Sequence, residues 1–161
     1  MSTLGSLFAK LGSVADLFFD VPEVSRHITF NRTFGGTRLP HLENGIFLND
    51  IHFQDINAPG LIVNSMPVLF FTTAHRGLPK FTIRVNSTRV FARDFTRSDT
   101  GGSWHVFIPP GALMRENNEV VLGVSGADQD ETEVIIGDML ILYKSNELTI
   151  RRPLVIAPTP T

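Results

Sequence analysis

The sequence predicts an all-β protein, an antiparallel β-sandwich built from short strands. First, apolar and polar residues alternate in Lys80–Val85 and Trp104–Ile108, which is the period of a half-buried strand. Second, turn-forming residues separate such runs, as at Asn86-Ser87, Pro109-Pro110-Gly111 and Asn117-Asn118. About eight to ten strands at this spacing are typical of a sandwich or a barrel.

Length and composition limit the other possibilities. The 161 residues suffice for one domain with a full core. The 14 Lys and Arg nearly balance the 16 Asp and Glu, which does not favour nucleic-acid binding. The sequence has no cysteine, which excludes disulfides and thiolate metal ligands. No apolar run approaches the roughly 20 residues of a membrane-spanning helix, and we expect neither a membrane span nor a signal peptide. The localisation stays open.

Two parts are expected, an amphipathic helix over residues 1–20 and a single β-sandwich domain over residues 21–161. Within the first part, apolar residues recur along one helical face at Leu4, Leu7, Phe8, Leu11, Val14, Ala15 and Phe18. Gly5 and Gly12 each cost about 1 kcal/mol relative to alanine, so this helix needs a surface to lie against. It either covers the sandwich or docks on another subunit.

Strands of the second part are predicted, in order, over residues 25–34, 46–53, 61–63, 68–71, 80–85, 90–95, 104–108, 120–124 and 134–143, with short apolar pieces at 148–150 and 154–156. The stretch 37–45 is predicted to be a loop-rich connection, and Phe47, which is out of phase, indicates a β-bulge. Runs 68–71 and 134–143 are apolar on both faces and predict strands covered on both sides. The expected core includes Phe81, Ile83, Trp104, Val106, Ile108, Val120 and Leu122.

From Lys80 onward the order of features resembles that of the galactose-binding-like jelly rolls. The shared features are Arg84-Val85-Asn86, the run Trp104-His105-Val106-Phe107-Ile108-Pro109, Leu113 followed by Asn117-Asn118-Glu119-Val120, and Ile136-Gly137-Asp138-Met139 with Tyr143. This resemblance implies a jelly-roll fold and a carbohydrate-binding, lectin-like role. Ser87 stands where the family usually has a turn glycine. Sugar-binding members usually expose Trp or Tyr side chains, whereas the single Trp104 and Tyr143 are expected in the core here.

Motifs that would indicate catalysis are missing. The sequence has no Gly-x-Ser-x-Gly elbow, P-loop, dinucleotide fingerprint or His-Glu-x-x-His, and its five histidines are never paired at metal-ligand spacing along one element. We therefore expect a protein that is not an enzyme, and two hypotheses remain. The first is a recognition module for a carbohydrate or another cell-surface ligand. The second is a structural subunit of a larger particle such as a virion or a secretion machine, homo-oligomeric or docked through the N-terminal helix.

Loops at one end of the sandwich are the predicted ligand-binding site. In an antiparallel meander, successive turns fall at alternate ends, so the loops 74–79, 96–103 and 125–133 share one rim. They would bring together six polar residues, His75, Arg76, Arg97, Asp99, Asp128 and Asp130. No cofactor is expected. Four carboxylates in the Asp128–Glu133 loop suit calcium in composition, although the spacing is not that of an EF-hand and a solvated loop is the ordinary alternative.

Overall fold

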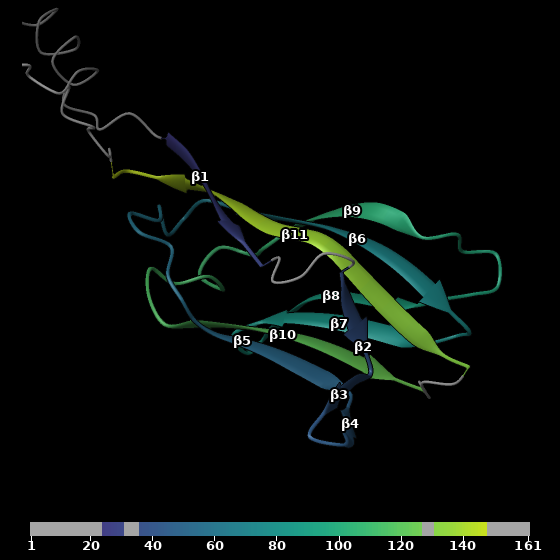
Figure 1. Cartoon of the computed structure of the whole chain (residues 1–161). Helices are drawn as coiled ribbons and strands as arrows, with labels where there is room; N and C mark the ends of the chain where they lie inside the picture. Colours follow the sequence, from purple (N-terminus) through teal and green to yellow (C-terminus); the bar gives the residue numbers. More distant parts are fainter. Residues whose placement is uncertain (1–23, 31–35, 127–130, 148–161) are drawn as a thin grey trace, which may run out of the picture.

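The structure is a computed structural model that describes residues 24–30, 36–126 and 131–147. These residues form antiparallel sheets, which confirms the predicted all-β antiparallel fold, and no helix occurs in the described ranges. Figure 1 shows two sheets stacked as layers, with a small hairpin projecting beyond them. The predicted helix over residues 1–20 and the apolar pieces 148–150 and 154–156 lie outside the described residues.

The first sheet contains the strands in the order β1-β11-β6-β9. Their bounds are Val24–Thr29 for β1, Glu133–Ser145 for β11, Val68–Arg76 for β6 and Gly102–Phe107 for β9. The short strand β2 (Thr37–Leu39) pairs with the beginning of β11, beyond the end of β1. Because β11 is 13 residues long, it provides one edge for both short partners.

The second sheet has the order β5-β10-β7-β8. Its strands are β5 (Asp50–Ile56), β10 (Asn118–Ser125), β7 (Lys80–Val85) and β8 (Thr88–Asp94). A third, two-stranded sheet consists of β3 (His41–Glu43) and β4 (Ile46–Leu48). Asn44 and Gly45 connect these two strands with φ angles of 51° and 80°, the left-handed conformation that a type I′ hairpin turn requires at both positions.

Strand order fixes which loops are neighbours. When only the strands of six or more residues are counted along the chain, the first sheet reads 1-8-3-6 and the second reads 2-7-4-5. Most successive strands therefore lie in different sheets and run in opposite directions. The loops β6–β7, β8–β9 and β10–β11 consequently gather at one end of the molecule, on the right in Figure 1.

Side chains between the two sheets form the core, as the period-2 alternation of their strands requires. Phe71 packs edge-on against Phe91 and Phe81, with ring centroids 4.9 and 6.3 Å apart. Phe81, Ile83, Ile108, Val120 and Leu122 are buried as predicted. Trp104 and Val106 are only partly buried, because β9 lies at the edge of the first sheet and none of the described strands covers it on its outer side.

The end of the sandwich away from the rim is closed by a buried amide. Asn118 is 1% exposed, and its Nδ2 donates hydrogen bonds to the carbonyl oxygens of Ile56 and Met114. Its Oδ1 accepts from the Met114 N–H and from Asn86 Nδ2, at 2.7 and 3.1 Å. The four bonds satisfy the amide fully and fix the chain entering β10 against the β7–β8 turn.

Three predictions about individual strands were wrong. The connection 37–45 contains strands β2 and β3, and Phe47 lies in the separate strand β4 rather than in a bulge. Leu61 forms an isolated bridge with Ser145 instead of starting a strand. The predicted cover on both faces of β6 and β11 is not supplied by the described residues, which bury one face and leave Phe70 and Leu142 exposed on the other. The pairing of β11 with β6 shifts register between Gly137 and Leu140, where Asp138 has a φ of 41°.

Candidate functional site

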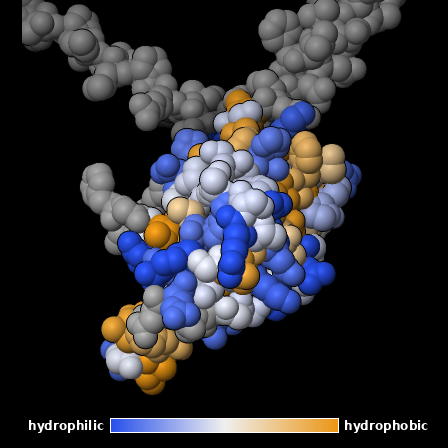
Figure 2. Space-filling view, turned by 90° about the vertical axis from the view of Figure 1, so that its right-hand side faces the viewer, coloured by the Kyte–Doolittle hydropathy of each residue, from blue (hydrophilic) through white to orange (hydrophobic). Residues whose placement is uncertain are grey.

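The three loops at the rim enclose an open cleft of about 540 Å³. Its lining comes from the end of β6 and the loop after it (His75, Gly77 and Leu78), the loop after β8 (Arg97 and Asp99) and the loop before β11 (Gly126, Glu131 and Thr132). Figure 2 looks straight at this end and shows hydrophilic residues across its centre. The structure thus brings three of the predicted residues, His75, Arg97 and Asp99, to one place.

Asp99 organises the β8–β9 loop. Its Oδ2 accepts hydrogen bonds from the backbone N–H of Thr96 at 2.7 Å and from the Thr96 hydroxyl at 2.9 Å, while Oδ1 pairs with the guanidinium of Arg93. These bonds, with the Thr96 N–H contributing most, lower the pKa of Asp99 from 3.8 to about 2. The carboxylate therefore stays ionised, and both of its oxygens accept hydrogen bonds from Thr96 or Arg93.

His75 lies at the inner wall of the cleft. Its ring stacks on Phe95 with a centroid distance of 4.3 Å, and Nε2 donates to the Thr96 carbonyl oxygen at 3.3 Å. The other ring nitrogen, Nδ1, is buried and has no hydrogen-bond partner in the part of the chain that is described. His75 therefore ties β6 to the β8–β9 loop and leaves one polar atom unsatisfied.

Arg76 points away from this cleft. Successive residues of a strand face opposite sides of the sheet, so Arg76 lies on the outer face when its neighbour His75 lines the cleft. There its guanidinium is 3.8 Å from Glu133, which also accepts two hydrogen bonds from Arg38 at 2.9 and 3.1 Å. The structure therefore does not bring Arg76 into the cleft with His75, Arg97 and Asp99.

Asp128 and Asp130 lie outside the described residues, as does much of the predicted calcium loop. Of the carboxylates in that loop that are described, Glu131 lines the cleft and Glu133 pairs with arginine. Within residues 24–30, 36–126 and 131–147, no three His, Asp or Glu side chains are grouped so that they could hold a metal ion. No helix in these ranges could cross a membrane.

Aromatic side chains do not form a stacking platform in the described part of the rim. Trp104 Nε1 donates to Thr73 Oγ1 at 2.8 Å, its ring stacks with that of Phe71 at a centroid distance of 6.4 Å, and the Arg93 guanidinium lies 4.7 Å above it. Tyr143 is 4% exposed, and burial raises the pKa of its hydroxyl. Both side chains therefore serve packing.

The β3–β4 hairpin is a surface that the sequence reasoning missed. Leu42 is 60% exposed and pairs across the strands with Phe47, which is 54% exposed. Ile46 and Leu48 are exposed on the opposite face of the hairpin, at 64% and 37%. Figure 2 shows a hydrophobic cluster at the lower left, where this hairpin projects. The Asn44-Gly45 pair directly before the apolar run Ile46–Leu48 was the available signal, since Asn-Gly strongly favours a two-residue hairpin turn.

Comparisons with known proteins support the fold only. No protein-family model and no curated protein match the chain. A solved structure of dimeric latent PorU from Porphyromonas gingivalis is similar, with a TM-score of 0.55 and 8% identity, over 76% of this chain and 13% of that chain. A structure of infectious bursal disease virus Gx strain matches with a TM-score of 0.32 and 13% identity, over 74% of this chain and 31% of that one. This chain thus spans a small part of either protein, and the resemblance to the galactose-binding-like family stays a prediction.

Proposed function

We propose that this protein is a non-catalytic structural subunit that assembles with a second copy of itself through the β3–β4 hairpin. The observation that carries this proposal is the exposure of four large apolar side chains, Leu42, Ile46, Phe47 and Leu48, on one projecting hairpin. They form one apolar pair on each face of the hairpin, Leu42 with Phe47 and Ile46 with Leu48. Exposed apolar side chains gathered in this way on a protein surface usually mark an interaction site.

Hairpin geometry favours pairing with an identical hairpin. Strands β3 and β4 form a two-stranded sheet without a third strand among the described residues, so both of its edges carry backbone groups available for pairing. A lone two-stranded hairpin is marginally stable in water, and three or more strands with an apolar face are far more stable. Two hairpins that meet edge to edge about a two-fold axis would form a four-stranded sheet, and two-fold dimers are the commonest homo-oligomers.

The strand order supports a jelly-roll assignment for the main domain. The orders 1-8-3-6 and 2-7-4-5 are those of a double-sheet jelly roll, in which eight strands form two Greek keys. Jelly rolls serve both as capsid domains and as lectins. The assignment is therefore compatible with a structural subunit, but the fold alone does not select it.

Light scattering coupled to size exclusion tests the proposal on the full chain. We expect the wild type to elute with twice the chain mass of 17.8 kDa at high concentration. The double variant Leu42→Ser/Phe47→Ser should elute as a monomer with an unchanged melting temperature. Leu78→Ser/Met114→Ser removes two similarly exposed side chains elsewhere and should remain dimeric. A monomeric wild type at every concentration, or a dimeric hairpin variant, would contradict the proposal.

A second candidate function is recognition of a polar ligand, such as a carbohydrate on a cell surface, by the rim cleft. It is favoured by the convergence of three loops around Arg97, His75 and Thr132. Binding there would use hydrogen bonds, because an aromatic platform is missing from the described part of the rim. Calorimetry or a glycan array with and without a chelator tests this candidate. The candidate would be supported if Arg97→Ala abolished binding. Arg84→Ala, on the outer face of the second sheet, should leave binding intact.

A further inference from the structure

A second apolar surface, the outer patch, lies on the face of the first sheet that points away from the second. Strand register places two rows of side chains there. One row is His27, Leu142, Val68 and Phe107, and the next is Thr29, Leu140, Phe70 and His105. We define the outer patch as the five apolar members of these rows, Val68, Phe70, Phe107, Leu140 and Leu142.

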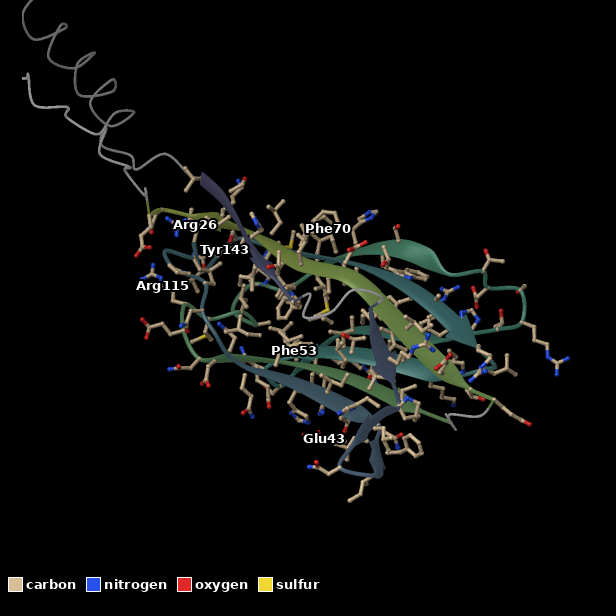
Figure 3. All side chains as sticks on the ribbon, viewed as in Figure 1. Arg26, Glu43, Phe53, Phe70, Arg115 and Tyr143 are labelled. Carbon is tan, nitrogen blue, oxygen red and sulfur yellow. The ribbon has the colours of Figure 1, made fainter. Side chains whose placement is uncertain are left out.

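Exposure shows that nothing in the described chain covers the outer patch. Phe107 is 60% exposed, Phe70 38% and Leu142 36%. Figure 3 shows Phe70 on the outer side of the sheet, whereas Phe53 lies between the two sheets. An antiparallel sheet whose outer face meets water normally carries polar residues there. The patch therefore requires a partner.

We propose that residues 4–18 of the same chain cover the outer patch as an amphipathic helix. The helical face Leu4, Leu7, Phe8, Leu11, Val14, Ala15 and Phe18 supplies the apolar surface that the patch lacks. Such a helix is about 22 Å long. The four strands of the sheet span about 14 Å between their outer members, so the helix lying across them covers both rows.

Strand β1 begins at the end of the first sheet that is near the outer patch, so residues 4–18 precede it at that end. Val24, the first residue of β1, pairs with Ser145, and Leu142 in the first row of the patch lies only three residues before Ser145 in β11. That separation is about 10 Å. Residues 19–23 span up to about 17 Å when extended, so they suffice to turn the chain back over the sheet.

The short connection between the proposed helix and β1, residues 19–23, favours the helix of the same chain as the segment that covers the outer patch. A tether of five residues gives the segment an effective concentration in the millimolar range over its own sheet, which favours the same chain over a second copy. Residues 148–161 leave β11 at the same end, but Pro153, Pro158 and Pro160 interrupt any helical face in that stretch. The proposal is independent of the hairpin, which lies beyond the opposite sheet (Figure 1).

Paramagnetic labelling of the full chain tests the proposal. The sequence has no cysteine, so Ser103→Cys places a single nitroxide label on the outer face beside the patch. We expect the amide signals of residues 4–18 to lose most of their intensity. A label at Arg84→Cys, on the outer face of the second sheet, should leave them unchanged. Adding Phe70→Ser/Phe107→Ser to the Ser103→Cys chain should restore the signals, whereas Leu78→Ser/Met114→Ser should not.

Three results would overturn the proposal. In the first, the Ser103 label leaves the signals of residues 4–18 intact. In the second, broadening also appears when a spin-labelled chain is mixed with an isotope-labelled chain that carries no nitroxide, which would make a second copy the occupant. In the third, the signals of residues 148–156 are lost instead.

Discussion

The two sheets share one core but present different surfaces to their surroundings. On the second sheet, outward positions of β7 are polar, and Lys80 lies 3.7 Å from Asp94 on β8. On the first sheet, the equivalent positions hold Phe70, Phe107 and Leu142. The inward alternation is the same in both sheets and suffices for the fold. The outward difference is therefore unrelated to the core, and we attribute it to what each surface binds.

The largest expected difference in the free energy of unfolding is between substitutions on the two faces of β6. Phe71 is 1% exposed and packs against Phe81, Phe91 and Trp104, so Phe71→Ala should lower the free energy of unfolding by about 3–5 kcal/mol. Its neighbour Phe70 points outward, where only the proposed helix covers it, so Phe70→Ala should lower the free energy of unfolding clearly less than Phe71→Ala does. Urea denaturation of both variants measures the difference. Similar losses would show that the outer patch is as much a part of the folded core as Phe71.

A smaller effect is expected at Trp104, which faces inward from the edge strand β9. Its ring is partly buried between Phe71, Phe91 and the Arg93 guanidinium. Trp104→Ala should therefore lower the free energy of unfolding by about 2–3 kcal/mol, below the usual range for a fully buried tryptophan. Trp104→Phe should recover most of the loss. A change within about 0.5 kcal/mol for Trp104→Ala would place the ring outside the core altogether.

The smallest effect concerns the polar outer face of the second sheet. Glu119 accepts hydrogen bonds from His52 Nδ1 at 2.8 Å and from Gln54 Nε2 at 3.1 Å, and these bonds, that of His52 foremost, lower its pKa below 4.5. A carboxylate with a lowered pKa stabilises the fold at pH values above 4.5, and this contribution is lost as the pH falls through the folded-state pKa.

We therefore expect the melting temperature of the wild type to fall more steeply below pH 4.5 than that of Glu119→Gln. Glu116→Gln changes an exposed glutamate in the loop before β10 and serves as the control. Scanning calorimetry from neutral pH to about pH 3 provides the curves. Parallel curves for the wild type and Glu119→Gln would mean that these hydrogen bonds do not hold the carboxylate in solution.

Strict alternation made much of the fold predictable from sequence. Lys80–Val85 was predicted with the bounds that β7 has, because its apolar residues face one side and Asn86 adopts the positive φ of a turn. Alternation does not report whether an apolar outward face is covered. The runs 68–71 and 134–143 were therefore predicted to be buried on both sides, although Phe70 and Leu142 are exposed.

The candidate sites were predictable only in part. Counting turns at alternate ends placed three rim loops together, and His75, Arg97 and Asp99 do line one cleft. The sequence could not show that Thr96 and Arg93 donate hydrogen bonds to the Asp99 carboxylate, because these bonds depend on the conformation of the loop. The hairpin was missed because strands of three residues are too short to show a period.

Hydrogen exchange at the hairpin tests the central claim, self-assembly through β3 and β4, most directly. In a monomer, amides on the outer edges of residues 41–43 and 46–48 have no partner strand among the described residues, and we expect them to exchange rapidly. We predict that their exchange slows as the concentration of the full chain rises, and that Leu42→Ser/Phe47→Ser removes this dependence. Amides of the core strand β10 should be unaffected by concentration in both proteins. Hairpin exchange that stays fast and independent of concentration would contradict the account.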